Sequence, residues 1–180
     1  MKVVSIVGMT GAGKSEVAGV FEEDGFIKIR FGDVTDEEIE KRGLEPNEKS
    51  ERRIRELLRK EGGMAVYARL NLPRINSALT YADVVIDGLY SWEEYTFLKD
   101  YYREDFYVVA VYASPRTRHA RLAERSSRCL TLEEAAGRDR AEVENINKGG
   151  PIAMADYTII NESSLEDLEE EARRVIANLK

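Results

Sequence analysis

The stretch that most constrains the fold is a glycine-rich segment near the N-terminus, Gly8-Met9-Thr10-Gly11-Ala12-Gly13-Lys14-Ser15. An apolar, β-branched run precedes it at residues 3–7, and apolar residues follow it at helical spacing, at Val17, Val20 and Phe21. The segment is therefore expected to connect a strand to a helix. It also matches the pattern G-x-x-x-x-G-K-[ST] at every fixed position, which separates it from an ordinary glycine-rich turn.

The residue types in this segment suit a bound polyphosphate. Glycine lacks a Cβ atom, so the backbone can take strained turns and approach a phosphate closely. The N–H groups of the loop and the N-terminus of the next helix then face the anion. Lys14 is expected to reach the β- and γ-phosphates of ATP, and the Ser15 hydroxyl to coordinate Mg²⁺. The predicted nucleotide-binding residues of the segment are Gly8, Met9, Thr10, Gly11, Ala12, Gly13, Lys14 and Ser15.

Size and composition exclude several classes of protein. A chain of 180 residues with 43% apolar residues suits one α/β domain with an inserted piece. The net charge of -7 argues against a general nucleic-acid-binding surface. The single cysteine, Cys129, fits a reducing cytosol. The sequence has no signal peptide pattern and no apolar stretch of the ~20 residues that span a bilayer, so we expect a cytoplasmic protein without a membrane partner.

Strand and helix patterns alternate along the whole chain. Apolar runs predict further strands at residues 26–31, 83–88, 106–113 and 156–160. Such alternation favours a parallel sheet covered by helices on both faces. The long segment between the second and third strands reads as mostly helix, with Pro73 expected to start, kink or interrupt a turn. Helix starts are predicted from four capping pairs, Thr35 with Glu38, Ser91 with Glu94, Thr131 with Glu134, and Ser163 with Glu166.

Two aspartates follow predicted strands at the edge where open parallel sheets bind ligands. Asp87 closes the apolar run of residues 83–88, as a Walker-B aspartate does beside a phosphate loop. We therefore expect Ser15 and Asp87 to hold Mg²⁺ together. The alternative for Asp87 is a solvated carboxylate at a strand end. Asp33 follows the second predicted strand.

Residues 114–140 are rich in arginine. The segment carries seven arginines, Arg116, Arg118, Arg121, Arg125, Arg128, Arg138 and Arg140, in a chain that is acidic as a whole. Three of them, Arg118, Arg121 and Arg125, are spaced to share one helix face. Guanidinium groups can contact phosphates at two points and stack on purines. The alternative is a solvated helix face with intrahelical ion pairs. His119 is expected on the surface, without a metal.

The sequence resembles the P-loop kinases of the nucleoside-monophosphate kinase group. Within that group it looks closest to dephospho-CoA kinases and to the archaeal-type proteins described as dephospho-CoA or adenylate kinase-like. The motifs that carry the resemblance, besides the glycine-rich segment, are Phe31-Gly32-Asp33, Val85-Ile86-Asp87-Gly88, Arg121-Leu122-x-x-Arg125 and residues 155–161 with 164–168. The resemblance covers nearly the whole chain.

This resemblance implies a three-layer α/β/α sandwich around a five-stranded parallel sheet in the order 2-3-1-4-5. It implies one domain, 1–180, with a helical substrate-binding insertion at 34–80 and a lid at about 126–140. Arg121 and Arg125 would lie at the lid hinge and touch adenine and phosphates. Asn161 would line the adenine pocket, and Asp33 would meet the phosphoryl acceptor as base or orienting carboxylate. Catalysis would thus depend on Lys14, Asp33 and Arg125.

The acceptor is where the sequence departs from adenylate kinases. Asp36 stands where those enzymes place an arginine, and Asp87-Gly88 leads to Leu89 rather than to an aromatic residue and Pro-Arg. A monophosphate acceptor would then need its cation from Arg69 or Arg74. We expect an ATP-dependent kinase of dephospho-CoA, or alternatively of a nucleoside monophosphate, acting as a monomer or small homo-oligomer. The further alternative is a nucleotide-dependent switch without a small-molecule acceptor.

Overall fold

The computed structural model describes residues 1–125 and 129–179. Its sheet has five parallel strands in the order β2-β3-β1-β4-β5, which confirms the predicted topology. β1 lies at the centre and pairs with β3 on one side and β4 on the other. The strands are β1 Val3–Val7, β2 Ile27–Arg30, β3 Val84–Asp87, β4 Phe106–Tyr112 and β5 Tyr157–Ile160.

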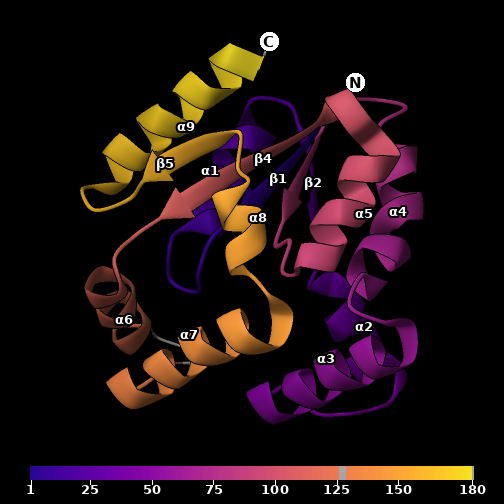
Figure 1. The fold of residues 1–180 in the computed structure, drawn as a ribbon, viewed down its shortest axis with the longest axis vertical. Helices are drawn as coiled ribbons and strands as arrows, with labels where there is room; N and C mark the ends of the chain where they lie inside the picture. The colour runs from indigo at the N-terminus through magenta and orange to yellow at the C-terminus, as the bar shows by residue number, and fades with distance from the viewer. Residues whose placement is uncertain (126–128, 180) are drawn as a thin grey trace.

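Helices cover both faces of this sheet, as Figure 1 shows. Their bounds are α1 Lys14–Glu23, α2 Asp33–Lys41, α3 Glu48–Gly62, α4 Val66–Ala78, α5 Trp92–Tyr102, α6 Pro115–Ala123, α7 Leu132–Ile146, α8 Gly149–Ala153 and α9 Leu165–Leu179, with a 3-10 turn η1 at Arg103–Asp105. α1 and α9 pack on one face. α4, α5 and α8 pack on the other, so the molecule has three layers.

Alternation along the central strand supplies both cores. Val3 and Val7 of β1 face the core under α4 and α5, and Val4 and Ile6 face the core under α1 and α9. All four side chains are fully buried, as expected for a central parallel strand. The loop that follows β1 is therefore held at the middle of the sheet edge.

The segment between β2 and β3 is helical, but two details differ from the sequence prediction. α2 begins at Asp33 rather than after Thr35, because the Thr35 hydroxyl bonds the Tyr67 hydroxyl at 2.6 Å instead of capping a helix. α4 runs continuously through Pro73. Its buried residues on both sides of the proline hold it against the core, so packing outweighs the lost N–H donor.

The other predicted helix starts are mostly correct. Ser91 with Glu94 and Thr131 with Glu134 both form complete capping boxes. The start of α9 is shifted by one residue, because Ser164 and Asp167 make the capping hydrogen bonds that we expected of Ser163 and Glu166. α6 ends at Ala123.

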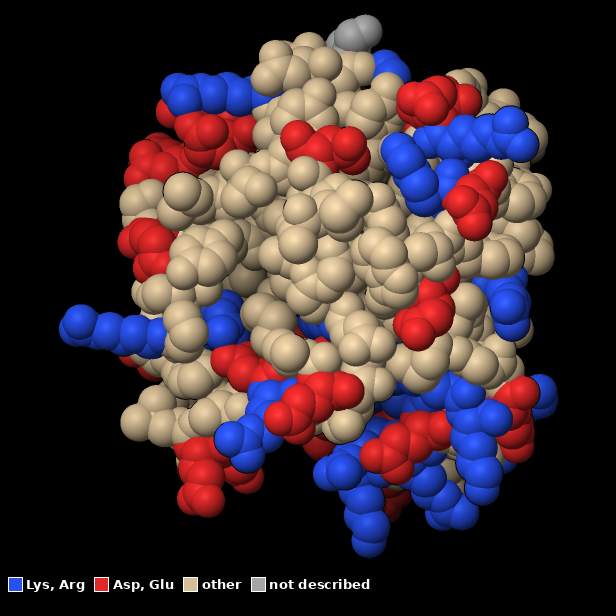
Figure 2. Space-filling model, in the orientation of Figure 1, with Lys and Arg blue, Asp and Glu red and all other residues tan. Residues whose placement is uncertain are grey.

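Charge is unevenly distributed over the surface. Figure 2 shows lysine and arginine side chains gathered where α3 lies in Figure 1, with a hollow in the outline between α3 and α7. In the part of the chain that the structure describes, the helices are too short or too polar to cross a bilayer.

Candidate nucleotide-binding site

The glycine-rich segment forms the loop between β1 and α1, as predicted. Gly8 and Gly13 have positive φ angles of 145° and 98°, and Gly13 is the N-cap of α1. A Cβ atom at Gly8 would press on the backbone carbonyl of Val111, and one at Gly13 on the side chain of Asn161. Both positions therefore require glycine for conformation and for space.

Ser15 and Asp87 lie together at the adjacent ends of the loop and β3. The Ser15 hydroxyl donates a hydrogen bond of 2.9 Å to an Asp87 carboxylate oxygen. A hydroxyl and a carboxylate are oxygen donors of the kind that Mg²⁺ accepts, with water and phosphate oxygens completing its shell. No group of three or more acidic, histidine or cysteine side chains suited to a metal occurs among the described residues. The donor set thus fits a metal that arrives with a phosphate ligand.

Lys14 folds back onto its own loop, where its ammonium donates to the carbonyl oxygen of Met9 at 3.1 Å. Burial and the positive charge of Lys148 lower the pKa of Lys14, the charges of Glu142 and Asp87 oppose them, and the net pKa is about 7. A phosphate would supply the negative charge that this ammonium lacks.

The structure brings Glu142 and Lys148, which the sequence did not single out, to the phosphate loop. The Thr10 N–H and hydroxyl both donate to the Glu142 carboxylate, at 3.3 and 2.5 Å. Lys148 donates to the same carboxylate at 2.8 Å. Burial would raise the pKa of Glu142, but Lys148, the Thr10 hydroxyl and Lys14 together lower it to about 2. A buried, ionised carboxylate, hydrogen-bonded to Lys148, therefore adjoins Thr10.

Arg118 is a buried brace of the loop, which corrects the prediction of a shared arginine face. Its guanidinium makes a two-point contact with Asp139 at 2.7 Å and donates to the Thr10 carbonyl oxygen at 3.0 Å. Only 4% of Arg118 is exposed. His119 is also more buried than expected, because its ring lies 2.9 Å from Asp139. α6 and α7 are thus paired through Asp139.

Asn161 and Arg121 meet behind the loop. The Asn161 amide donates to the carbonyl oxygen of Ala12 at 2.8 Å, and Arg121 donates to the Asn161 amide oxygen at 3.1 Å. Arg125 lies beyond the end of α6, is exposed, and does not share a helix face with Arg121. The predicted lid at 126–140 begins in residues 126–128, which lie outside the described residues, and continues into α7.

Asp33 is the first residue of α2 and lies at the end of β2. It accepts a hydrogen bond of 2.8 Å from Arg30, whose guanidinium also binds Asp36 at 2.7 Å. Both arginines that we considered as alternative cations bind other groups. One guanidinium nitrogen of Arg74 donates to both carboxylate oxygens of Glu37, and Arg69 donates to the Gly62 carbonyl oxygen. Carboxylate groups therefore predominate around Asp33, since the arginines named here are already bound to other groups.

Aromatic residues connect the phosphate loop to the insertion. Tyr90, three residues after Asp87, has its ring 6.4 Å from that of Tyr67 in α4. The Arg59 guanidinium lies over the Tyr67 ring at 5.0 Å, and its Nε is buried without a hydrogen-bond partner among the described residues. Burial raises the pKa of the adjoining Glu94 carboxyl to about 7. These side chains form a polar-aromatic wall between α3, α4 and α5.

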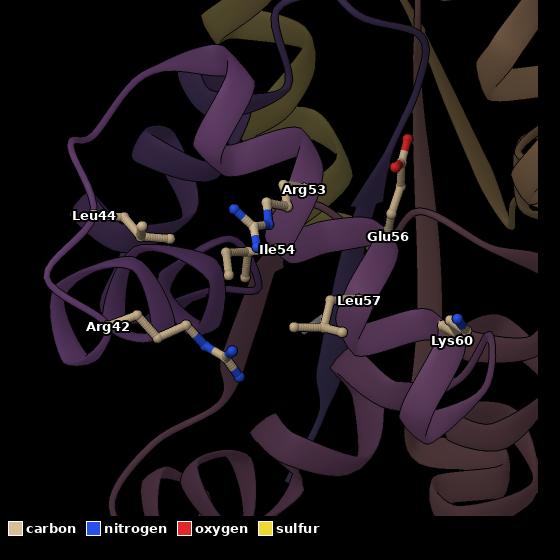
Figure 3. Close-up of a pocket in the computed structure, with 7 residues that line it drawn as sticks. All are labelled: Arg42, Leu44, Arg53, Ile54, Glu56, Leu57 and Lys60. Atoms are coloured by element: carbon tan, nitrogen blue, oxygen red, sulfur yellow. The ribbon is translucent and has the colours of Figure 1, made fainter.

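A separate surface pocket of about 440 Å³ lies between the end of α2 and α3. Figure 3 shows Arg42 extending from the end of α2 toward Ile54 and Leu57 of α3. None of the residues that line it belongs to the phosphate loop or to a strand end: they are Arg42, Leu44, Arg53, Ile54, Glu56, Leu57 and Lys60. The pocket is therefore no part of the nucleotide site.

Sequence reasoning missed three residues for different reasons. Glu142 and Lys148 are far from Thr10 in sequence and fit no local motif. Arg30 stood in a predicted strand, where alternation alone says only that it points away from the core. The one available signal was Lys148 in an otherwise uncharged stretch, Asn145-Ile146-Asn147-Lys148-Gly149-Gly150.

Residues 4–146 match the family model described as AAA domain. Among curated proteins, a UPF0200 protein from Thermococcus kodakarensis is 36% identical over 178 residues, covering 97% of this chain and 96% of the relative. A UPF0200 protein from Aeropyrum pernix is 38% identical over 174 residues, covering 96% and 90%. The likeness extends over nearly the full length of both relatives.

Solved structures share the fold at lower identity. TT1252 from Thermus thermophilus superposes with a TM-score of 0.68 at 23% identity, covering 99% of this chain and 98% of that one. Shikimate kinase from Acinetobacter baumannii, in complex with shikimate, gives 0.61 at 19%, covering 100% and 95%. Dephospho-CoA kinase from Campylobacter jejuni gives 0.59 at 13%, covering 99% and 97%. At these identities the matches show a P-loop kinase-like fold.

Proposed function

Because this chain belongs to the UPF0200 family and carries a complete phosphate loop, we propose that it is an ATP-dependent phosphotransferase acting on a small molecule. The observation that carries the proposal is the Ser15–Asp87 hydrogen bond at 2.9 Å, next to Lys14 and across the sheet edge from Asp33. Ser15, Lys14, Asp87 and Asp33 lie at neighbouring strand ends, which supports a metal site, a phosphate-binding lysine and an acceptor carboxylate in these roles.

In this proposal the loop from Gly8 to Ser15 binds the triphosphate of ATP. Ser15 and Asp87 hold Mg²⁺, which when bound neutralises phosphate charge. Lys14 leaves the Met9 carbonyl oxygen and binds the β- and γ-phosphates. Asn161 keeps the loop carbonyl of Ala12 in place, and Arg121, which holds Asn161, lies on the base side of the nucleotide.

The acceptor enters from the insertion at 34–80. Its hydroxyl oxygen attacks the γ-phosphorus, the bond between that phosphorus and the β–γ bridging oxygen breaks, and ADP leaves. Asp33 orients the hydroxyl and receives its proton. Arg30 fixes Asp33 through the 2.8 Å contact. Arg125, exposed just beyond the end of α6, binds the phosphates during transfer.

A hydroxyl acceptor, with dephospho-CoA as first choice, is favoured by the carboxylates at the site. Arg30 is shared by Asp33 and Asp36, and Arg74 is taken by Glu37. A hydroxyl needs a carboxylate partner, whereas a monophosphate needs a free cation. One observation favours a nucleoside monophosphate instead, namely Arg59, whose buried Nε makes no hydrogen bond within the described residues.

The test is a screen of ATP consumption with Mg²⁺ and each acceptor in turn, dephospho-CoA and the common nucleoside monophosphates. We expect ADP formation to depend on dephospho-CoA. An Arg59→Gln variant is the matched control. It should leave ADP formation with dephospho-CoA unchanged, whereas it should slow ADP formation if a nucleoside monophosphate is the acceptor. ADP formation that no acceptor accelerates would contradict the proposal and favour a nucleotide-dependent switch.

A further inference from the structure

Lys148 is a buried basic residue next to the phosphate loop, and it has no role in the reaction proposed above. It follows α7 and precedes α8, and only 1% of it is exposed. Asn147 adopts a left-handed conformation with φ 51°, and the Lys148 N–H then bonds the carbonyl oxygen of Glu142 at 3.1 Å. This turn brings the Lys148 side chain back along α7 to the Glu142 carboxylate. Burying an ammonium group costs free energy unless nearby anions and hydrogen bonds compensate for the lost water.

The partner of Lys148 occupies a position suited to phosphate. Glu142 accepts hydrogen bonds from the Thr10 N–H and hydroxyl, and N–H groups of such a loop are the groups that bind phosphate oxygens. The Glu142 carboxylate therefore lies beside Thr10, and a bound phosphate would be the second anion that contacts this loop. Lys148, at 2.8 Å from that carboxylate, is therefore linked to the loop through Glu142 and Thr10.

Lys148 also lies on the side from which an acceptor would enter. Its ammonium is 5.3 Å from the centroid of the Tyr90 ring. Tyr90 contacts Tyr67 of α4, and Tyr67 bonds Thr35 of α2. The cation is therefore placed between the phosphate loop and the insertion, where the transferring phosphoryl group would pass.

Basic groups gather around the Glu142 carboxylate. Lys148 and Arg138 both contact it, at 2.8 and 3.5 Å. Lys14 lies in the same cluster with Asp87, and the negative charge of Asp139 also acts on Lys148. The phosphates of a bound nucleotide would add their negative charge among these basic groups.

Resting on the function proposed above, we propose that Lys148 is a catalytic cation that binds the γ-phosphoryl group of ATP, and that Glu142 positions it before the nucleotide arrives. Lys14 then binds the β- and γ-phosphates from the loop side, and Lys148 binds the γ-phosphate from the acceptor side. Charge that spreads over the γ-phosphate oxygens during transfer is stabilised from both sides.

The test compares the binding of ADP and of a non-hydrolysable ATP analogue, both with Mg²⁺, by calorimetry. In Lys148→Met we expect the analogue to bind about 10- to 100-fold more weakly, as for a lost charge-assisted hydrogen bond, and ADP less than threefold more weakly. Lys28→Met is the matched control, because Lys28 pairs with Glu22 on the surface. It should leave both affinities unchanged.

A double variant, Lys148→Met with Glu142→Gln, separates the phosphate ligand from a mere counter-ion of Glu142. Neutralising Glu142 removes any repulsion by an unpaired carboxylate. In the double variant, binding of the ATP analogue should still be weakened more than binding of ADP. The double variant also provides this measurement if Lys148→Met alone does not fold. Recovery of wild-type discrimination in the double variant, or an equal loss for both nucleotides, would overturn the inference. A wild-type protein that binds neither nucleotide would instead overturn the proposed function.

Discussion

At the scale of single residues, Thr10 is where the phosphate loop meets α6 and α7. Its N–H and hydroxyl bond Glu142, and its carbonyl oxygen accepts from Arg118. The pattern G-x-x-x-x-G-K-[ST] leaves this position open, so the motif predicts the loop but not what holds it. The loop geometry depends on buried charges that arrive from far along the chain.

Lys14 provides the first prediction. Lys14→Ala should lower turnover by at least ~10²–10³, because a positioned cation at developing charge typically supplies that much rate. Its side chain bonds only the Met9 carbonyl oxygen of its own loop among the hydrogen bonds of the described residues, so the fold should persist. Steady-state kinetics and a thermal melt measure both effects. Near-normal transfer by this variant would remove Lys14 from the mechanism.

Glu142 makes stability depend on pH in a defined direction. Its pKa is lowered from 4.5 to about 2 in the folded state, so its ionised form stabilises the fold. The contribution is complete above pH 4.5 and is lost as the pH falls through 2; at full size it is on the order of 3 kcal/mol.

Denaturant unfolding of the wild type and Glu142→Gln between pH 6 and pH 2 measures this contribution. The wild type should be the more stable protein at pH 6, and the difference between the two should shrink as the pH falls. A difference in the free energy of unfolding that stays constant over this range would contradict the buried, ionised state of Glu142.

At the scale of elements, local patterns located most strands and helices. Apolar runs and capping boxes at Ser91 and Thr131 depend on neighbours in sequence, and they were correct. The errors occurred where a distant partner decided the outcome. Thr35 bonds Tyr67 instead of capping a helix, and Arg118 is buried by Asp139 instead of facing solvent or nucleotide. In the candidate site, the sequence predicted that Ser15 and Asp87 lie together, as they do. Glu142 fits no local motif, and for Lys148 the one signal was a single charge in an uncharged stretch.

The end of α6 separates the expected roles of two arginines. Arg121 braces Asn161 behind the loop, so Arg121→Ala should raise the KM for ATP more than it lowers kcat. In the proposed function Arg125, past the end of the helix, binds the phosphates mainly in the transition state, so Arg125→Ala should lower kcat more than it weakens ATP binding. Kinetics and a melt of each variant test this. Wild-type kinetics in both, with stability changed by only a few tenths of a kcal/mol, would indicate solvated surface residues.

At the scale of the whole molecule, one sheet edge gathers all the proposed chemistry. The phosphate loop follows β1, Asp87 ends β3 and Asp33 follows β2, so adjacent parallel strands place them side by side. The insertion and α7 lie on either side of that edge in Figure 1. The order β2-β3-β1-β4-β5 thus explains why these residues, distant in sequence, form one site.

Metal removal tests this shared edge. A chelator should abolish turnover, since the metal site that we propose at Ser15 and Asp87 would need the ion to neutralise phosphate charge. Some nucleotide binding should remain, because the loop N–H groups and Lys14 do not depend on the metal. Adding Mg²⁺ back should restore turnover. Undiminished turnover in chelator would count against both residues.

The most direct test of the central claim follows the γ-phosphoryl group itself. ATP labelled at the γ-phosphate is incubated with the protein, Mg²⁺ and the acceptor found in the screen, with Lys14→Ala alongside. We predict that the label appears on the acceptor hydroxyl with the wild type, that it is nearly absent with Lys14→Ala, and that little inorganic phosphate forms without acceptor. Label that appears only as inorganic phosphate, at the same rate with and without acceptor, would contradict phosphoryl transfer to a small molecule.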